Sequence, residues 1–253
     1  MGLLSGCVGP QISEFFNEEY NANENTVIRV TTINGQLEIS SWDGDTVKVD
    51  AVKKTRIGQE ELDLTKITVD EFNEILEITV EYTGTRVITP SVDINIKIPS
   101  NVTVETATTS NGQVIINGVK GDIQAQSSNG GIFIEDVDGF VSASTSNGQI
   151  SIKSTTGVGD ISTSNGRISV EIFDFQEDIV IDSSNGDIQV YLKPYLNADL
   201  KMSTSNGEVS VSGLSLNLTT SEDKYKKGTI GLGGDLIEIE TSNGDIELYQ
   251  LDN

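Results

Sequence analysis

Short runs of alternating apolar and polar residues dominate the chain. The run Gln149-Ile150-Ser151-Ile152-Lys153 is typical, and a period of two places its aliphatic side chains on one face of a β-strand. Seven such runs follow a Ser-Asn-Gly triplet, and the positions three and five residues after each Asn are always aliphatic. These two columns are Val114, Ile132, Ile150, Ile168, Ile188, Val209 and Ile246, and then Ile116, Ile134, Ile152, Val170, Val190, Val211 and Leu248.

The triplet recurs at a nearly constant spacing. Successive Asn residues are 18, 18, 18, 20, 21 and 37 positions apart, and they are Asn111, Asn129, Asn147, Asn165, Asn185, Asn206 and Asn243. A fixed period of this length indicates a solenoid, in which each repeat buries its apolar face only by stacking on its neighbours. The last gap is close to two turns, so we expect a turn without its signature within Ser221–Gly234.

Each turn is predicted to hold two short strands. The inward period continues before each Asn through an apolar column, from Ala107 and Ala125 to Ile239, and then through a Ser/Thr column, from Thr109 and Ser127 to Thr241. Asn-Gly would form one corner, because both residues tolerate positive φ, and Gly121, Gly139 and Gly159 would form the second. The prediction is an all-β, single-stranded parallel β-helix, a β-solenoid of about 18–21 residues per turn.

The seven Asn side chains should then stack into a ladder. In such a ladder the Asn amides and the Ser/Thr hydroxyls would satisfy one another at the corner. A ligand-binding row of Asn residues is the alternative, and it would make the same corner a recognition site.

The N-terminal third keeps the register only in part. Ile33-Asn34-Gly35 reads as a degenerate first turn, and the period then breaks between Ala51 and Thr106. We expect residues 25–106 to form that turn and a β-rich cap, and residues 107–253 to form the regular coil. The cap segments expected are a short helix at Gln59–Leu64 and strands at Lys66–Val69, Ile75–Tyr82 and Val92–Ile98.

The first residues suggest a membrane anchor. Leu4-Ser5-Gly6-Cys7 resembles the lipobox of secreted lipoproteins, in which a lipid is joined to the Cys, although only six residues precede Cys7. Residues 1–24 are therefore interpreted as a lipobox remnant followed by a flexible acidic tether containing Glu14, Glu18 and Glu19. We expect Cys7 to carry the whole attachment to the membrane.

Composition narrows the classes of function. A formal net charge of −23 would repel a phosphate backbone, so nucleic acid is not an expected partner. The absence of His and the single Cys exclude Ser-His and Cys-His catalysis, and no metal site or cofactor is expected. Asn101-Val102-Thr103 and Asn217-Leu218-Thr219 match the N-glycosylation pattern, so Asn101 and Asn217 are candidate acceptors.

Ile39-Ser40-Ser41-Trp42-Asp43-Gly44, the run Asp93–Pro99 and the Ser-Asn-Gly turns together resemble the putative adhesin family known as DUF4097. The resemblance covers the chain from about Asn25 onward and implies a β-helix, with a right-handed coil, on the cell envelope. It implies no catalytic residues.

The function expected is therefore a lipid-anchored, non-catalytic adhesin or scaffold on the extracellular face of the envelope, with a surface glycan or protein as its ligand. Sensing of envelope stress is the alternative that the resemblance also implies. A polysaccharide-active enzyme is a third class, because such enzymes also use β-helices and carboxylates.

Overall fold

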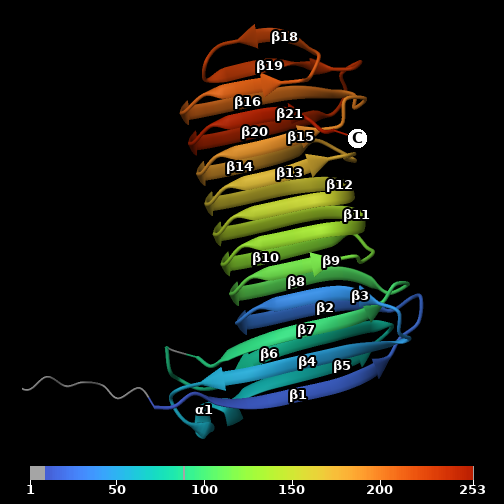
Figure 1. Ribbon diagram of the computed structural model, residues 1–253, viewed down its shortest axis with the longest axis vertical. Coiled ribbons are helices and arrows are strands. Elements are labelled where there is room, and N and C mark those ends of the chain that lie inside the picture. Colours follow the sequence, from blue (N-terminus) through green and yellow to red (C-terminus); the bar gives the residue numbers. More distant parts are fainter. Residues whose placement is uncertain (1–8, 88, 253) are drawn as a thin grey trace, which may run out of the picture.

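The computed structural model describes residues 9–87 and 89–252 as a long stack of β-strands (Figure 1). In the central coil the strands that lead into each Asn form one column, and the strands that follow it form a second. The first column is β8 (Thr103–Asn111), β10 (Ile123–Asn129), the second halves of β11 (Ile132–Asn147) and β12 (Ile150–Asn165), and β14 (Ile179–Asn185). The second is β9 (Val114–Asn117), the first halves of β11 and β12, β13 (Ile168–Ile172) and β15 (Ile188–Leu192).

The predicted register is confirmed in this region. Each strand pairs in parallel with the same strand one turn on, so that Asn129 lies opposite Asn147 and Asn147 opposite Asn165. The predicted aliphatic columns are buried between the two columns of strands, except Val211, which is only partly buried. Burial of a Val, Leu or Ile side chain contributes about 1.5–3 kcal/mol, so this stacked interior is the main source of stability.

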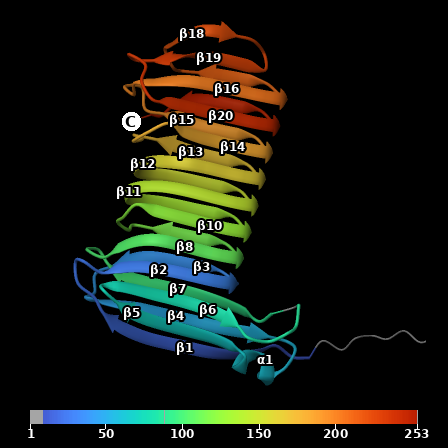
Figure 2. The ribbon, with the colours of Figure 1, turned by 180° about the vertical axis from the view of Figure 1, so that it is seen from behind.

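The C-terminal turns do not stack in chain order. The elements there are β16 (Ala198–Asn206), β17 (Val209–Ser212), β18 (Leu216–Ser221), β19 (Tyr225–Ile230), β20 (Leu236–Asn243) and β21 (Ile246–Gln250). β20 pairs with β14 on one side and β16 on the other, and β21 likewise lies between β15 and β17 (Figures 1 and 2). The last turn of the chain therefore fills a slot between two earlier turns.

The prediction of a degenerate turn within Ser221–Gly234 is wrong. This segment contributes to an antiparallel hairpin, in which β18 pairs with β19 and β19 pairs with the outer edge of β16. The hairpin covers an edge that would otherwise present unpaired backbone groups. Within the 37-residue gap the chain thus forms a hairpin that covers the end of the rod, and it then runs back to place β20 between β14 and β16.

The N-terminal end is a cap of mixed pairing. Its elements are β1 (Ile12–Asn21), β2 (Val27–Asn34), β3 (Leu37–Trp42), β4 (Thr46–Thr55), α1 (Gln59–Asp63), β5 (Thr65–Phe72), β6 (Ile75–Tyr82) and β7 (Ser91–Pro99). The predicted helix and cap strands are confirmed, and β2 and β3 form the first turn, with Asn34 opposite Asn111. Beyond that turn lie β6 and β7, followed by antiparallel β5, β4 and β1.

Antiparallel pairing at both ends means that a purely parallel coil describes only the region between them. All-β architecture is confirmed, and the right-handed sense of the coil stays a prediction. α1 lies against β4 and β5 and buries Leu62 fully beside them.

The flexible tether is contradicted for its C-terminal part, because β1 is a strand paired along its length with β4. Two of the three acidic residues that suggested a tether, Glu14 and Glu19, lie opposite lysines, and Glu18 lies opposite Val49. Glu14 pairs with Lys53 at 2.9 Å and Glu19 with Lys48 at 3.0 Å. Phe16 packs against the core from the same strand. Sequence composition missed this because cross-strand charge pairs look like an unpaired acidic run when one strand is read alone.

Candidate binding surface

The Asn side chains form a continuous row of hydrogen bonds along one edge of the rod. In the order Asn111, Asn129, Asn147, Asn165, Asn185, Asn243 and Asn206, the Nδ2 of every Asn after the first donates to the Oδ1 of the Asn before it at 2.8–3.0 Å. All seven side chains are exposed. The row is therefore a regular, hydrogen-bonded surface that runs along the rod.

Behind this row, buried Ser and Thr hydroxyls donate to Gly carbonyls of the adjacent turn. Thr145 donates to Gly130 O at 3.0 Å, and Thr163 donates to Gly148 O at 3.1 Å. The expectation that Asn amides and hydroxyls satisfy one another is thus wrong. Thr109 is the exception, since its Oγ1 has no hydrogen-bond partner within residues 9–87 and 89–252.

Glycine is required at the corner by close approach of neighbouring turns. A Cβ on Gly148 would lie 2.1 Å from Gly130 O, and one on Gly166 would lie 1.9 Å from Gly148 O. The positive-φ explanation for the Asn is wrong, because none of the seven has a positive φ. The same Gly therefore recurs at this corner of successive turns because the turns stack too closely for a Cβ.

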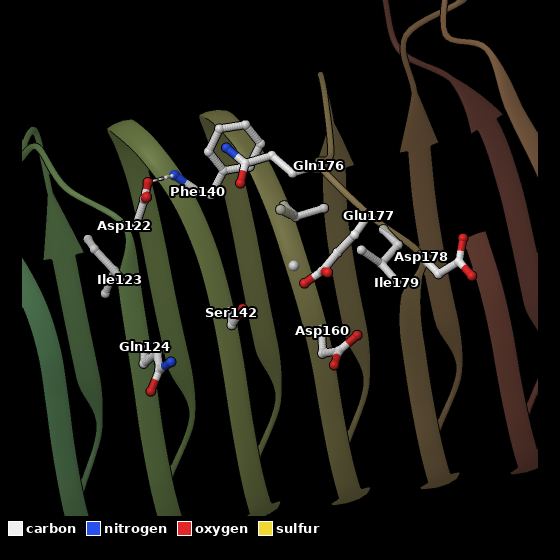
Figure 3. A pocket seen from close by; sticks show the side chains of 12 residues that line it. Asp122, Ile123, Gln124, Phe140, Ser142, Asp160, Gln176, Glu177, Asp178 and Ile179 are labelled. Atoms are coloured by element: carbon white, nitrogen blue, oxygen red, sulfur yellow. Dashed lines mark hydrogen bonds between the residues drawn. The ribbon is translucent and has the colours of Figure 1, made fainter. Parts of the chain in front are cut away.

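A groove of about 330 Å³ crosses the outer face of β10, β11 and β12 and reaches the segment before β14 (Figure 3). Its lining residues are Asp122, Ile123, Gln124, Phe140, Ser142, Val158, Gly159, Asp160, Gln176, Glu177, Asp178 and Ile179. Figure 3 shows the carboxylates of Asp122, Asp160 and Glu177 around the same opening.

Backbone amides fix the three Asp side chains of the groove. Asp122 Oδ1 accepts from the N–H of Phe140 at 2.9 Å, Asp160 Oδ1 accepts from Val180 at 2.9 Å, and Asp178 Oδ1 accepts from Leu236 at 2.7 Å. Each donor belongs to the next turn of the stack. The Asp side chains therefore hold adjacent turns together and are held in one orientation by the same bond.

Sequence reasoning missed this groove, although a signal exists. Each of the three Asp residues directly precedes a buried Ile, as in Asp122-Ile123, Asp160-Ile161 and Asp178-Ile179. An Asp at this position of a turn places its carboxylate on the outer face of the stack.

Acidic residues continue along the same face beside the groove. Asp182 lies opposite Glu240, and burial raises the pKa of the Asp182 carboxyl, with repulsion from Glu240 and Asp160 adding to the increase. Lys201 pairs with Glu238 and Glu240 on the neighbouring turn. Acidic side chains therefore dominate this face beside the groove, and lysines follow at its C-terminal edge, where Lys201 lies opposite Lys227.

The opposite face carries aromatic side chains. Tyr191 and Tyr249 stack with ring centroids 5.2 Å apart, and the ammonium of Lys193 lies 5.6 Å from the centroid of the Phe173 ring. The groove, in contrast, combines a cavity with carboxylates that backbone amides hold in one orientation. We therefore treat the groove as the stronger candidate.

The other predicted positions are not brought together. Cys7 lies outside the described residues, while Asn101 and Asn217 are exposed and lie in separate parts of the rod. Among residues 9–87 and 89–252 no group of three or more acidic or Cys side chains is arranged to hold a metal ion. Nor does any described helix have the length and apolarity to cross a membrane.

Comparison with solved structures finds similar chains of bacterial origin. A putative cell adhesion protein from Clostridium sporogenes is 15% identical, with coverage of 96% of this chain and 100% of that chain and a TM-score of 0.35. A putative adhesin from Parabacteroides distasonis is 14% identical, with coverage of 94% and 97% and a TM-score of 0.43. A putative lipid binding protein from the same organism is 11% identical, with coverage of 95% and 97% and a TM-score of 0.36.

A search of curated proteins finds no match. A family model does match, and it spans the first turn, the cap, the central coil and the inserted last turn. On that match over residues 28–249, the chain belongs to the Toastrack DUF4097 family.

Proposed function

We propose that the protein is a non-catalytic, adhesin-like rod on the extracellular face of the cell envelope, attached by a lipid on Cys7. Solved relatives that are named putative adhesins support a surface role. The lipobox-like Leu4-Ser5-Gly6-Cys7 supports the anchor. The rod would present its groove to a glycan or protein on another surface.

The observation that carries this proposal is the orientation of the groove carboxylates. Asp122 and Asp160 each use Oδ1 to accept a backbone N–H, and their second oxygens have no hydrogen bond to the described chain. Fixed acceptors beside the exposed Gln124 and the Phe140 ring suit a hydroxyl-rich ligand, because sugars combine hydroxyl donors with apolar ring faces. A preorganised site loses less entropy on binding.

A matched pair of substitutions tests the groove. Gln124 and Gln126 are both exposed on β10, two positions apart on one face, but only Gln124 lines the groove. We expect Gln124→Trp to abolish binding of the purified protein to glycan arrays and protein-coated beads, and Gln126→Trp to retain it. Equal loss or equal retention in the two variants would remove the groove from the proposal.

The anchor is tested separately in cells. With a native secretion signal present, Cys7→Ser should release the protein from membranes, because one thiol carries the attachment. Retention of this variant after a salt wash would contradict the anchor. Cross-linking in intact cells that recovers a membrane regulator, and no glycan or foreign surface, would favour the stress-sensing alternative.

A further inference from the structure

Exposed apolar side chains gather at the N-terminal end of the rod. Ile57 follows β4, Leu64 follows α1 and Val87 lies in the loop between β6 and β7, and they are 38%, 37% and 99% exposed. Figures 1 and 2 show α1, that loop and the start of β1 at one side of this end. We call Arg56, Ile57, Leu64, Arg86 and Val87 the basal tip.

Contacts between the three segments hold the basal tip together. The N–H of Thr83 donates to Leu64 O at 2.9 Å, which joins the β6–β7 loop to the end of α1. Arg86 forms an ion pair with the buried Glu61 of α1. A cavity of about 650 Å³ lies between Gln11, Ile57 and Thr89, so the start of β1 adjoins the same place.

The described chain begins against this tip. A Cβ on Gly9 would lie 3.4 Å from Arg56 O, which places Gly9 beside the tip. Cys7 precedes Gly9 by two positions in the chain, and an extended chain spans at most about 3.6 Å per residue. The headgroup layer on each side of a bilayer is only about 5–8 Å deep. A lipid on Cys7 would therefore bring the basal tip to the headgroups.

The chemistry of the tip suits that position. Arg56 lies next to Ile57, and Arg86 lies next to Val87, where its ion pair with Glu61 offsets one acidic charge of α1. Arg56 has no ion-pair partner in the described chain. Apolar side chains with cations beside them are typical of surfaces that lie in the membrane interface, where phosphates pair with the cations.

We propose that the basal tip is a bilayer-contacting surface, which seats against phospholipid headgroups and directs the long axis of the rod away from the membrane. The inference rests on the proposed anchor, since the lipid on Cys7 brings the tip to the bilayer. The contact itself can be tested without cellular lipidation, so the two proposals can fail separately.

The experiment couples Cys7, the only Cys, to vesicles of phosphatidylcholine and phosphatidylglycerol that contain a maleimide lipid. Trp42 is replaced by Phe, so that a single reporter Trp can be introduced. The reporter is either Val87→Trp at the tip or Leu232→Trp in the turn between β19 and β20, where Leu232 is 94% exposed. Brominated lipid in the vesicles should quench the emission of Trp at position 87 and leave that at position 232 unchanged.

Charge reversal gives the second arm. Arg56→Glu should lose most of the quenching at position 87, while Lys226→Glu on β19 should leave it unchanged. Unquenched emission at position 87 in the coupled protein would overturn the proposal and leave the Cys7 anchor standing. Shielding of position 87 from acrylamide without vesicles would also overturn it, because the tip would then be covered in the absence of lipid.

Discussion

In the central coil the order of the turns in space is their order in the chain, whereas at the C-terminal end it is not. Asn129, Asn147 and Asn165 follow one another in both, but Asn243 lies between Asn185 and Asn206. The hydrogen bond from Asn243 to Asn185 is 2.9 Å long, the same as that from Asn147 to Asn129. The Ser-Asn-Gly corner of one turn thus fixes the register of that turn against any other turn with the same corner, but it does not determine which turn becomes the neighbour.

Removing the inserted turn should have the largest effect. Deletion of residues 236–253 removes Ile237, Ile239, Ile246 and Leu248, all fully buried. Because loss of one such side chain beyond Cβ costs about 2–5 kcal/mol, we expect the whole deletion to cost more than about 5 kcal/mol. Hydrogen exchange should show loss of protection in β16 to β19 and retention in β8 to β12.

The same deletion could instead let β16 and β17 move down onto β14 and β15, since the rungs are equivalent. Protection in β16 that survives the deletion would show this and would contradict the prediction. Such a result would also show that a fold in which the turns stack in chain order is stable.

A clash at the corner should have the next largest effect. The Cβ of Gly148→Ala would lie 2.1 Å from a backbone oxygen, so the turns must move apart, at a cost of about 2–3 kcal/mol. Gly159→Ala is the control, because the nearest atom to its Cβ is the Ser142 hydroxyl, which can rotate away. Urea melts that rank the two variants equally would contradict the stacking explanation for the corner glycines.

The repeat made the strand register of the central coil predictable. Features that depend on pairing between distant segments could not be predicted. Columns such as Ile132, Ile150 and Ile168 follow from alternation and a period of 18, because each side chain needs a like neighbour. The inserted turn did not follow, since Asn185 to Asn243 spans 58 residues and no local feature marks an empty slot. β1 was missed because the lysines that pair with its Glu14 and Glu19 lie on β4, and the groove was missed because its Asp residues look like corner residues when one turn is read alone.

Hydroxyls in the buried Ser/Thr row should contribute a smaller amount. Thr163→Val removes the donor to Gly148 O and leaves that carbonyl short of a partner, at a cost of about 0.5–1.5 kcal/mol. Thr109→Val is the matched control, because the described chain offers its Oγ1 no partner, and it should be neutral or stabilising. Equal losses in thermal melts would mean that the hydroxyl bonds contribute little.

The Asn row should contribute less, because its side chains are exposed. Asn147→Ala removes one bond given and one received, at about 0.5–1 kcal/mol. Asn243→Ala should match it, since Asn243 also lies between two neighbours, and Asn206→Ala at the end of the row should cost less. Unchanged stability of Asn147→Ala together with lost adhesion would identify the row as a recognition site.

The smallest expected effect lies on the face beside the groove, where the inserted turn changes the electrostatics. In one outward column the central coil has Ser144 and Ser162, but Asp182 then lies opposite Glu240 of the inserted turn. Burial and repulsion by Glu240 and Asp160 raise the pKa of Asp182 above its ordinary value. The folded state therefore binds this proton more tightly than the unfolded chain does, so the protonated form favours folding at low pH. That contribution is lost as pH rises through the raised pKa.

Asp182→Asn should consequently raise the melting temperature at pH 7, and the advantage should shrink below about pH 4, where Asp182 is protonated in both states. High salt at pH 7 should reduce the advantage, because it screens the repulsion from Glu240 but leaves the burial of Asp182 unchanged. Ser144→Asn in the central coil, where the column partners Gln126 and Ser162 carry no charge, should show no dependence on pH. Calorimetric melts at both pH values decide the point: an Asp182→Asn advantage of equal size at each would mean that the inserted turn places no electrostatic strain on β14.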